Sequence, residues 1–269
     1  MESINFKKSW NKENGKHEVI SYENSSLLLL EVDMLRLQKG ESKKYNEVDK
    51  EYGLLILGGS CSVVGEEFKF TKIGKRKDVF DGPATCLYIP ANRPFTITGE
   101  KDVSIAVCKA LVDDCPENDF EPVLVNPEDV IIKDLGKTGW ERQAHFILDE
   151  RVNANLIYIG EAYVKSGNWA SYPPHKHDDD NMPTEGIMEE IYYYEFDKPQ
   201  GFGIQKVYTK EGDIDETYTV KSGDFVEIPR GYHPFCCAPG YDNYYLWIMA
   251  GENRGFFMTT EESHKWLNK

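Results

Sequence analysis

Short runs of apolar residues recur along the whole chain, separated by Gly, Pro, Asn and Asp. Runs of this length that are rich in Val, Ile, Tyr and Phe are typical of β-strands, and long stretches of helical periodicity are scarce. The pattern therefore predicts a mostly β protein. Strands are expected at residues 26–37, 52–57, 85–89, 95–98, 104–110, 156–164, 191–196, 202–208, 225–228 and 244–249.

A helix is expected chiefly near the end of the chain. Thr259-Thr260-Glu261-Glu262 has the form of a capping box, in which a Thr and a Glu side chain satisfy free backbone amides at a helix start. The helix itself is predicted over residues 263–267.

Three histidines and one glutamate lie between or directly beside the expected strands, with the spacing of a metal site. Residues two apart on a strand point to the same face, so His175 and His177 can turn toward one point inside a barrel. Glu190 begins the next apolar run, and His233 follows an Ile-Pro-Arg-Gly turn in a third segment. Three imidazoles and a carboxylate suit one divalent metal, zinc or manganese first and iron as a further candidate.

The two halves of the chain share a pattern. Glu51 to Leu55 parallels Glu190 to Tyr194, and residues 89–95 parallel residues 228–235 with one residue fewer. A repeated pattern of this size indicates a duplicated barrel. In the first copy Arg93 stands at the position of His233, and no His-x-His segment is present, so we predict no metal there.

A segment rich in proline and acidic residues separates the two copies. It spans residues 113–129 and reads as a connector. We predict a first barrel without metal ligands at residues 1–112, a connector at 113–134 and a metal-binding barrel at 135–269.

Composition limits the partners of this protein. The 269 residues carry a net charge of −15, which argues against nucleic acid and anionic membranes, since both attract clustered Lys and Arg. The longest apolar run is too short to cross a bilayer, and residues 1–5 lack a leader pattern. We therefore expect a cytoplasmic protein.

A duplicated barrel with His-x-His, a Glu on the next strand and a final His after an Ile-Pro-x-Gly turn resembles the two-barrel cupins. More narrowly, the chain is similar to the 5-deoxy-glucuronate isomerases of bacterial myo-inositol catabolism. The similarity is dense over residues 135–255. It is carried by residues 167–178, 189–194, 201–208, 229–234 and 239–251.

This resemblance implies an all-β bicupin fold, with two cupin-type β-barrels of the double-stranded β-helix or jelly-roll type and a short C-terminal helix. It implies a metal-dependent aldose-ketose isomerase that converts 5-deoxy-glucuronate to 2-deoxy-5-keto-gluconate, and a homo-oligomer. The chemistry is compatible with the predicted site, because a Lewis acid stabilises the negative charge that develops when a proton beside a carbonyl is removed.

The isomerisation also needs a group that moves a proton between carbons. Glu189, Glu185, Tyr192 and a metal-bound hydroxide are all candidates, and we take Glu189 and Tyr192 as the candidate catalytic residues.

The substrate carboxylate requires a cation, which a guanidinium fork satisfies best. Arg230, Arg142 and Lys206 are the candidate substrate-binding residues.

Two other enzyme functions are considered. The first is the related 5-keto-4-deoxyuronate isomerase of pectin breakdown, which would use the same chemistry. The second is a metal-dependent cupin dioxygenase, since a fold does not fix a function. A non-enzymatic sugar-binding cupin would not need the complete ligand set.

Overall fold

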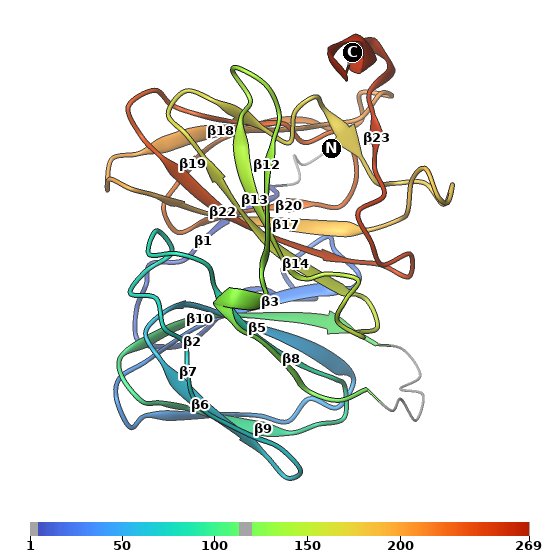
Figure 1. The fold of residues 1–269 in the computed structure, drawn as a ribbon. Coiled ribbons are helices and arrows are strands. Elements are labelled where there is room, and N and C mark those ends of the chain that lie inside the picture. Colours follow the sequence, from blue (N-terminus) through green and yellow to red (C-terminus); the bar gives the residue numbers. More distant parts are fainter. Residues whose placement is uncertain (1–4, 113–119, 269) are drawn as a thin grey trace.

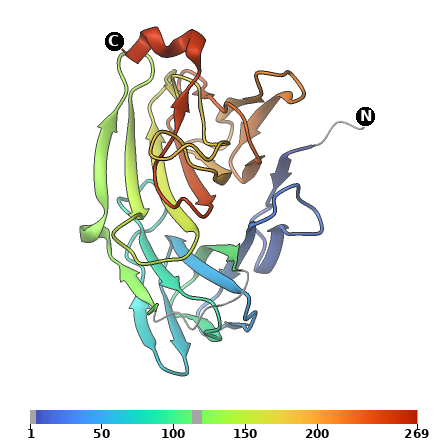
Figure 2. The ribbon, with the colours of Figure 1, turned by 90° about the vertical axis from the view of Figure 1, so that its right-hand side faces the viewer.

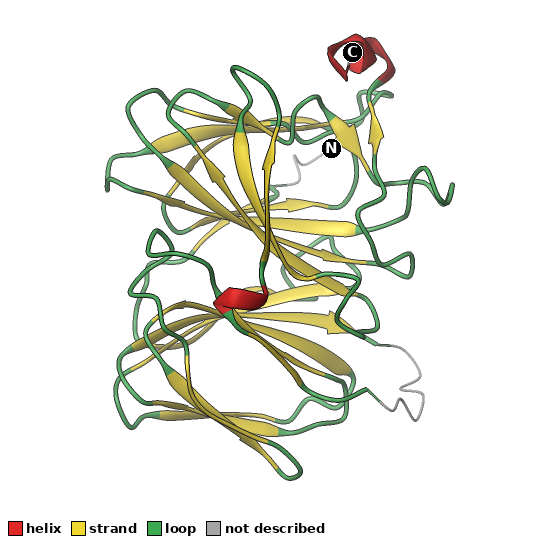
Figure 3. Ribbon diagram, viewed as in Figure 1, coloured by secondary structure: helices red, strands yellow, loops and turns green. Residues whose placement is uncertain are grey.

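The computed structural model describes residues 5–112 and 120–268. Within them the strands all pair antiparallel, and helix is confined to two short 3-10 segments, η1 (Pro127–Asp129) and η2 (Glu262–Asn268), as Figure 3 shows. The predicted all-β class and the short helix near the C-terminus are confirmed. The terminal helix is of the 3-10 type and not an α-helix.

The first barrel is formed by a six-stranded and a four-stranded sheet that enclose an apolar core. The six-stranded sheet has the order β11 (Val123–Val125), β8 (Thr85–Ile89), β5 (Lys50–Gly58), β10 (Val103–Leu111), β3 (Leu30–Leu37) and β2 (Gly15–Ile20). The four-stranded sheet has the order β4 (Ser42–Tyr45), β9 (Phe95–Gly99), β6 (Cys61–Gly65) and β7 (Lys69–Ile73).

The second barrel repeats this plan with a seven-stranded and a four-stranded sheet. The larger sheet has the order β1 (Lys7–Ser9), β20 (Asp224–Ile228), β17 (Glu189–Phe196), β22 (Asn243–Ala250), β14 (Ile157–Val164), β13 (Arg142–Leu148) and β12 (Ile131–Leu135). The smaller sheet has the order β15 (Trp169–Ala170), β21 (Phe235–Cys237), β18 (Phe202–Tyr208) and β19 (Asp215–Lys221). A separate pair joins β16 (His175–Lys176) to β23 (Thr259–Thr260).

The two barrels are stacked through their larger sheets (Figures 1 and 2). Along each strand of these sheets, alternate side chains point into the barrel or toward the other barrel. On β17, Tyr192 and Tyr194 belong to the interior core of the second barrel, whereas Ile191 and Tyr193 belong to a core shared by both barrels. The central strands of the larger sheets, such as β5, β17 and β22, are therefore buried on both faces, which explains their nearly continuous apolar sequences.

Each barrel receives an edge strand from outside the sequence range predicted for it. Strand β1, near the N-terminus, pairs with β20 of the second barrel, and β11, within the predicted connector, pairs with β8 of the first. The domain boundaries at residues 112 and 134 stay predictions. Residues 113–119 of the predicted connector lie outside the described residues. The strand pairing departs from these boundaries at β1 and β11, and also at β12, whose residues 131–134 lie in the predicted connector but pair with β13 of the second barrel.

The pairing also corrects the register of the internal repeat. Tyr52 of β5 pairs with Ile89, and Glu190 of β17 pairs with Ile228. Tyr52 is therefore the structural equivalent of Glu190, and Glu51 is the equivalent of Glu189. The sequence comparison aligned Glu51 with Glu190, one residue out of register, because it matched residue types without knowing the cross-strand partners.

Two equivalent glutamates tie the barrels together. The Glu51 carboxylate accepts hydrogen bonds from the backbone amides of Asn155, Leu156 and Ile157, at 2.9, 2.7 and 2.7 Å. The Glu189 carboxylate accepts hydrogen bonds from the amides of residues 28–30, at 2.6, 2.9 and 3.3 Å. Each barrel thus satisfies the amides at the start of a strand in the other. Hydrogen bonds to a charged acceptor are among the stronger ones in proteins.

In the described part of the chain, no helix has both the length and the apolar character needed to cross a membrane. Whether the protein is cytoplasmic stays a prediction.

Candidate metal centre

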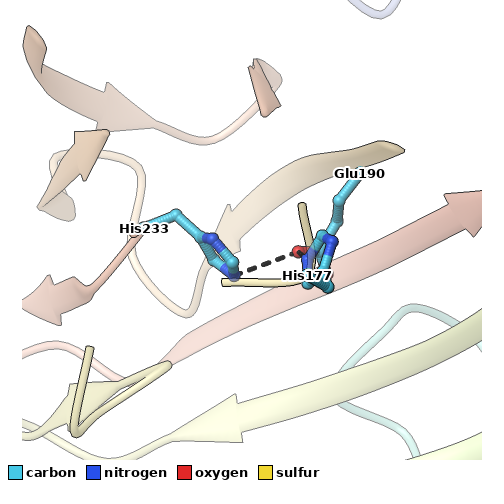
Figure 4. Close-up of side chains that lie close together, drawn as sticks. All are labelled: His177, Glu190 and His233. Atoms are coloured by element: carbon cyan, nitrogen blue, oxygen red, sulfur yellow. Dashed lines mark hydrogen bonds and ion pairs between the residues drawn. The ribbon is translucent and has the colours of Figure 1, made fainter. Parts of the chain in front are cut away.

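Three buried side chains from three separate segments converge inside the second barrel: His177, Glu190 and His233 (Figure 4). Glu190 points inward because it alternates with Glu189 and Ile191 along β17. His177 follows the short strand β16, and His233 follows the turn after β20. One atom from each side chain lies within 4.8 Å of the others.

The three side chains meet at one carboxylate oxygen. Oε2 of Glu190 lies 3.1 Å from Nε2 of His177 and 3.1 Å from Nε2 of His233. Nε2 of His233 is buried and has no well-aligned hydrogen bond. A buried imidazole nitrogen of this kind is commonly satisfied by a metal or a proton donor.

The outer nitrogens of both imidazoles are fixed by backbone carbonyls. Nδ1 of His177 lies 2.6 Å from the Met188 carbonyl oxygen, and Nδ1 of His233 lies 2.9 Å from the Gly231 carbonyl oxygen. Because a carbonyl can only accept, each Nδ1 carries a proton, and each Nε2 is free either to donate a second proton to Glu190 or to offer its lone pair to a metal. Metal-binding histidines typically have this arrangement, since the outer hydrogen bond sets the tautomer and the ring orientation.

The charges at the centre support one another. Burial would raise the pKa of Glu190, but the hydrogen bonds and charges of His177 and His233 lower it to about 2. Burial would lower the pKa of His177, yet the hydrogen bond and charge of Glu190 raise it. Glu190 is therefore an anion in the folded protein, as a carboxylate ligand must be.

The spacing of these atoms fits a metal ion. Ligand atoms that lie about 2.0 to 2.2 Å from a common metal ion are separated by about 3.3 to 3.6 Å in tetrahedral geometry and by about 2.8 to 3.1 Å in octahedral geometry. The two contacts of 3.1 Å around Glu190 lie at the boundary between these two ranges. The residues present could therefore hold a divalent cation with little movement of the backbone.

His175, the remaining predicted ligand, lies next to this group. Its ring centroid is 4.8 Å from that of His233, and its side chain lines the same cavity. Nδ1 of His175 lies 3.3 Å from the Pro173 carbonyl oxygen. Burial, together with the neighbouring imidazoles of His233 and His177, lowers its pKa well below the ordinary value, so the ring is neutral. Its role as a fourth ligand stays a prediction.

A cavity of about 30 Å³ borders the centre. Its walls combine the candidate ligands with apolar side chains and a few polar groups. They include His175, His177, Glu190, Arg142, Ser171, Tyr192, Tyr245, Trp247, Phe256 and Met258. Ser171, Tyr245, Phe256 and Met258 were not identified from the sequence, because no spacing rule marks these residue types as site residues and they reach the cavity only through folding.

Arg142 is the predicted cation that lines this cavity. It begins β13 and points to the same side as Ala144, which is another wall residue. Among the described residues no carboxylate lies within ion-pair distance of Arg142. Its positive charge is close enough to help lower the pKa of His175.

The other two predicted cations lie elsewhere. Lys206 forms a surface ion pair with Asp215, and Arg230 forms one with Asp213. Neither lines the cavity. The structure does not bring them to the cavity, and their assignment as substrate-binding residues stays a prediction. On β18, the side chain of Gln205 is fully buried, so that of its neighbour Lys206 points out.

Two of the candidate proton carriers are also committed to other contacts. Glu189 points away from the cavity and accepts hydrogen bonds from the amides of residues 28–30, so its assignment as a catalytic residue stays a prediction that this contact does not support. Glu185 is buried against Lys176, at 2.7 Å, and accepts hydrogen bonds from the amides of Asp178 and Asp179. Neither carboxylate lines the cavity.

We predict that Glu189→Gln lowers the free energy of unfolding by about 2 kcal/mol, because a neutral amide replaces a charged acceptor of three hydrogen bonds. Metal content should not change. Urea unfolding and elemental analysis measure the two quantities. Glu51→Gln, the equivalent change in the first barrel, is the matched control and should cost a similar amount. Loss of metal in Glu189→Gln alone would contradict the inward orientation of Glu190.

Tyr192, the other candidate catalytic residue, does line the cavity. Its hydroxyl lies 2.7 Å from Oγ of Ser171. Burial and the charge of Glu190 raise the pKa of Tyr192 well above its ordinary value, so the hydroxyl is protonated and can donate a hydrogen bond. Burial also raises the pKa of Tyr245, which lies beside Tyr192 with ring centroids 4.8 Å apart.

The equivalent place in the first barrel is filled by aromatic rings. Tyr52 replaces Glu190 and packs against Tyr45 and Phe95, with ring centroids 5.9 and 5.0 Å away. Arg93, predicted to replace His233, forms an ion pair with Glu67. Across residues 5–112 and 120–268, the group of acidic, His and Cys side chains close enough to hold an ion is the one in the second barrel.

Comparison with known proteins supports the family resemblance predicted from the sequence, over nearly the whole chain. The sequence profile of the KduI/IolB family matches residues 6–267. A 5-deoxy-glucuronate isomerase of Bacillus licheniformis is 39% identical over 253 residues, which cover 93% of this chain and 92% of the relative. One from Shouchella clausii is 42% identical over 217 residues, 80% of this chain and 78% of the relative.

Solved structures of other proteins have the same fold as this chain. An IolB-like protein from Salmonella typhimurium LT2 superimposes with a TM-score of 0.92 at 34% identity, covering 98% of this chain and all of the other. The oxalate decarboxylase of Lactobacillus farciminis, solved as a formate complex, gives a TM-score of 0.67 at 14% identity, covering 98% and 90% of the two chains. At that identity the likeness concerns the fold alone, and it supports the predicted cupin architecture.

Proposed function

The chain belongs to the KduI/IolB family, and on that premise we propose that it converts 5-deoxy-glucuronate to 2-deoxy-5-keto-gluconate with the help of one divalent metal. That it is an isomerase follows from the relatives of that name, which share 36 to 42% identity over most of the chain. The substrate, the product and the metal are the parts that we propose.

One observation carries the proposal. The cavity in the second barrel has His177 and Glu190 on its wall, in contact with His233, and an arginine without an ion pair among the described residues. A sugar acid has complementary ends, with a carbonyl and a hydroxyl at one and a carboxylate at the other. The proposed pose puts the carbonyl end beside His177 and Glu190 and the carboxylate at Arg142.

We propose that His175, His177, Glu190 and His233 hold the metal. Nitrogen and oxygen ligands of this kind suit zinc, manganese and iron, and the donor set does not select among them. When bound, such a cation would act as a Lewis acid toward the carbonyl and hydroxyl oxygens of the substrate.

The remaining groups of the cavity orient the substrate. Arg142 offers a planar pair of N–H donors that matches a carboxylate. Tyr192 can donate its hydroxyl proton to a sugar oxygen while its own oxygen accepts a hydrogen bond from the Ser171 hydroxyl, since the two oxygens lie 2.7 Å apart. Glu189 and Glu185 do not reach the cavity and the Tyr192 hydroxyl is protonated, so we propose that Tyr192 donates to a substrate oxygen; a metal-bound hydroxide is then the remaining candidate for the base that moves the proton between carbons.

Apolar side chains form the rest of the wall. Trp247 is contributed by β22, and Phe256 and Met258 by the segment that leads into β23. A space of about 30 Å³ holds only about two water molecules, whereas binding cavities for small molecules are about ten times larger. We therefore propose that Phe256 and Met258 move aside when the substrate enters.

The test is a reaction followed by NMR. Metal-loaded protein is incubated with 5-deoxy-glucuronate, and we expect signals of 2-deoxy-5-keto-gluconate without any nicotinamide, phosphate or oxygen. Turnover of 5-keto-4-deoxyuronate instead, with no product from 5-deoxy-glucuronate, would assign the second sugar-acid isomerase reaction. Oxygen consumption by an iron-loaded sample would assign a dioxygenase and reject the proposal. The homo-oligomer stays a prediction.

A further inference from the structure

Asp178, directly after His177, reaches across to the segment that carries His233. Its two carboxylate oxygens accept the Gly231 backbone N–H, at 2.9 and 3.0 Å. The Gly231 carbonyl in turn accepts the Nδ1 proton of His233, at 2.9 Å. One residue therefore connects the two segments that bring the imidazoles to Glu190.

The turn that receives this contact has little freedom of its own. Gly231 has a positive φ of 96°, and a Cβ at this position would lie 2.6 Å from the Tyr208 carbonyl oxygen. Tyr232 and Tyr208 exchange backbone hydrogen bonds at 2.8 and 2.9 Å. The turn is therefore held against β18 on one side, and Asp178 holds it on the side that faces His177.

Asp178 is itself held in place by its neighbours. Its backbone amide donates to Oε1 of Glu185 at 2.8 Å, and the same oxygen accepts the Asp179 amide at 3.1 Å and the Lys176 ammonium at 2.7 Å. Glu185 is only 3% exposed. The loop after His177 is thus folded around a buried carboxylate, and this directs the Asp178 side chain toward Gly231.

We propose that Asp178 is a positioning residue that sets the separation of His177 and His233 and so determines how tightly the centre binds its metal. The inference rests on the metal site of the proposed function. Without the carboxylate, the Gly231 amide loses its acceptor, and the turn that carries His233 is held only by its hydrogen bonds to Tyr208 and no longer by the segment of His177. Outer contacts of this kind change metal affinity by about 10- to 100-fold.

The experiment uses Co²⁺ as the probe and the full chain, and it measures both the dissociation constant and the visible absorption spectrum. Asp178→Ala is expected to weaken Co²⁺ binding by about 10- to 100-fold and to change the spectrum, because the ligand geometry changes. Asp178→Asn should fall between this variant and the unmodified protein, since an amide oxygen can accept the same N–H but without a charge.

Asp179→Ala is the matched control. Asp179 is the next acidic residue, its side chain is 71% exposed, and its carboxylate contacts Lys176 and not the His233 turn. It should bind Co²⁺ like the unmodified protein, with the same spectrum. An equal effect of Asp179→Ala would mean that charge near the site is responsible, and it would overturn the proposal.

Two further outcomes are decisive. If Asp178→Ala or folded Asp178→Asn binds Co²⁺ with unchanged affinity and spectrum, Asp178 does not position the ligands. If Asp178→Ala does not fold, the comparison of Asp178→Asn with the unmodified protein decides alone. Absence of Co²⁺ binding by the unmodified protein would instead reject the metal site itself. Failure of the metal site can therefore be distinguished from failure of the positioning role of Asp178.

Discussion

Glu190→Gln is expected to lose the metal and nearly all isomerase activity while the fold stays intact. The carboxylate of Glu190 contacts both His177 and His233, each at 3.1 Å. Structural zinc sites are worth about 10 to 16 kcal/mol over four ligands, so one ligand contributes roughly 2.5 to 4 kcal/mol. That corresponds to a loss of about 100- to 1000-fold in metal affinity.

Elemental analysis after dialysis and turnover followed by NMR measure the two effects. Glutamine has the shape of glutamate, so circular dichroism and thermal unfolding should show a folded protein. Glu189→Gln, one residue earlier on the same strand, is the matched control and should keep its metal. Retained metal and turnover in Glu190→Gln, measured in metal-depleted buffer, would remove Glu190 from the proposed ligands.

Arg142→Gln is expected to lower kcat/KM by about 30- to 5000-fold without changing the metal content. Removing one partner of a buried charge pair costs about 2 to 5 kcal/mol, because the other charge is left without compensation. If Arg142 holds the carboxylate equally in the ground state and the transition state, the loss appears mainly in KM. Arg142→Lys should recover part of it, since an ammonium supplies the charge but not the planar fork.

The chain supplies two controls for this prediction. Lys206→Gln and Arg230→Gln remove cations that pair with Asp215 and Asp213 at the surface, and neither should change kcat/KM by more than about twofold, as expected for exposed ion pairs. A large effect of Arg230→Gln together with none of Arg142→Gln would reverse the assignment of the carboxylate site.

The candidate ligands could be predicted from sequence because they follow local rules. Side chains alternate between the two faces of a strand, so spacing predicts which of them share a face. This rule applies to His175 and His177, which are two residues apart, and to Glu190 at the start of an apolar run. The structure brings His177, Glu190 and His233 to one point, within 4.8 Å. It places His175 at the same cavity but outside that group of three.

The partners of each polar side chain could not be predicted in the same way. In the sequence, Glu189 looked like a second carboxylate for the site. In the structure its carboxylate accepts hydrogen bonds from the amides of residues 28–30, about 160 positions away in the chain. Arg142, Lys206 and Arg230 looked alike as cations. Only the folded chain distinguishes the one at the cavity from the two that are paired at the surface.

The register of the repeat shows the same limit. Residue types alone matched Glu51 with Glu190, whereas the pairs Tyr52 with Ile89 and Glu190 with Ile228 show that Tyr52 is the equivalent position. A shift of one residue exchanges the inner and outer faces of a strand. It therefore changes which residue is the candidate ligand and which one ties the barrels together.

The sequence by itself determined the β class, the duplication and the family resemblance, together with the residue types of the candidate centre. These follow from alternation, turn residues and short motifs, whose physical causes act over a few residues. The tertiary structure decided which strands complete each barrel, which glutamate faces the cavity, which cation lines it and how Asp178 connects two ligand segments. Those features depend on contacts between segments far apart in the chain, and such contacts exist only once burial and cross-strand hydrogen bonding have fixed the register of every strand.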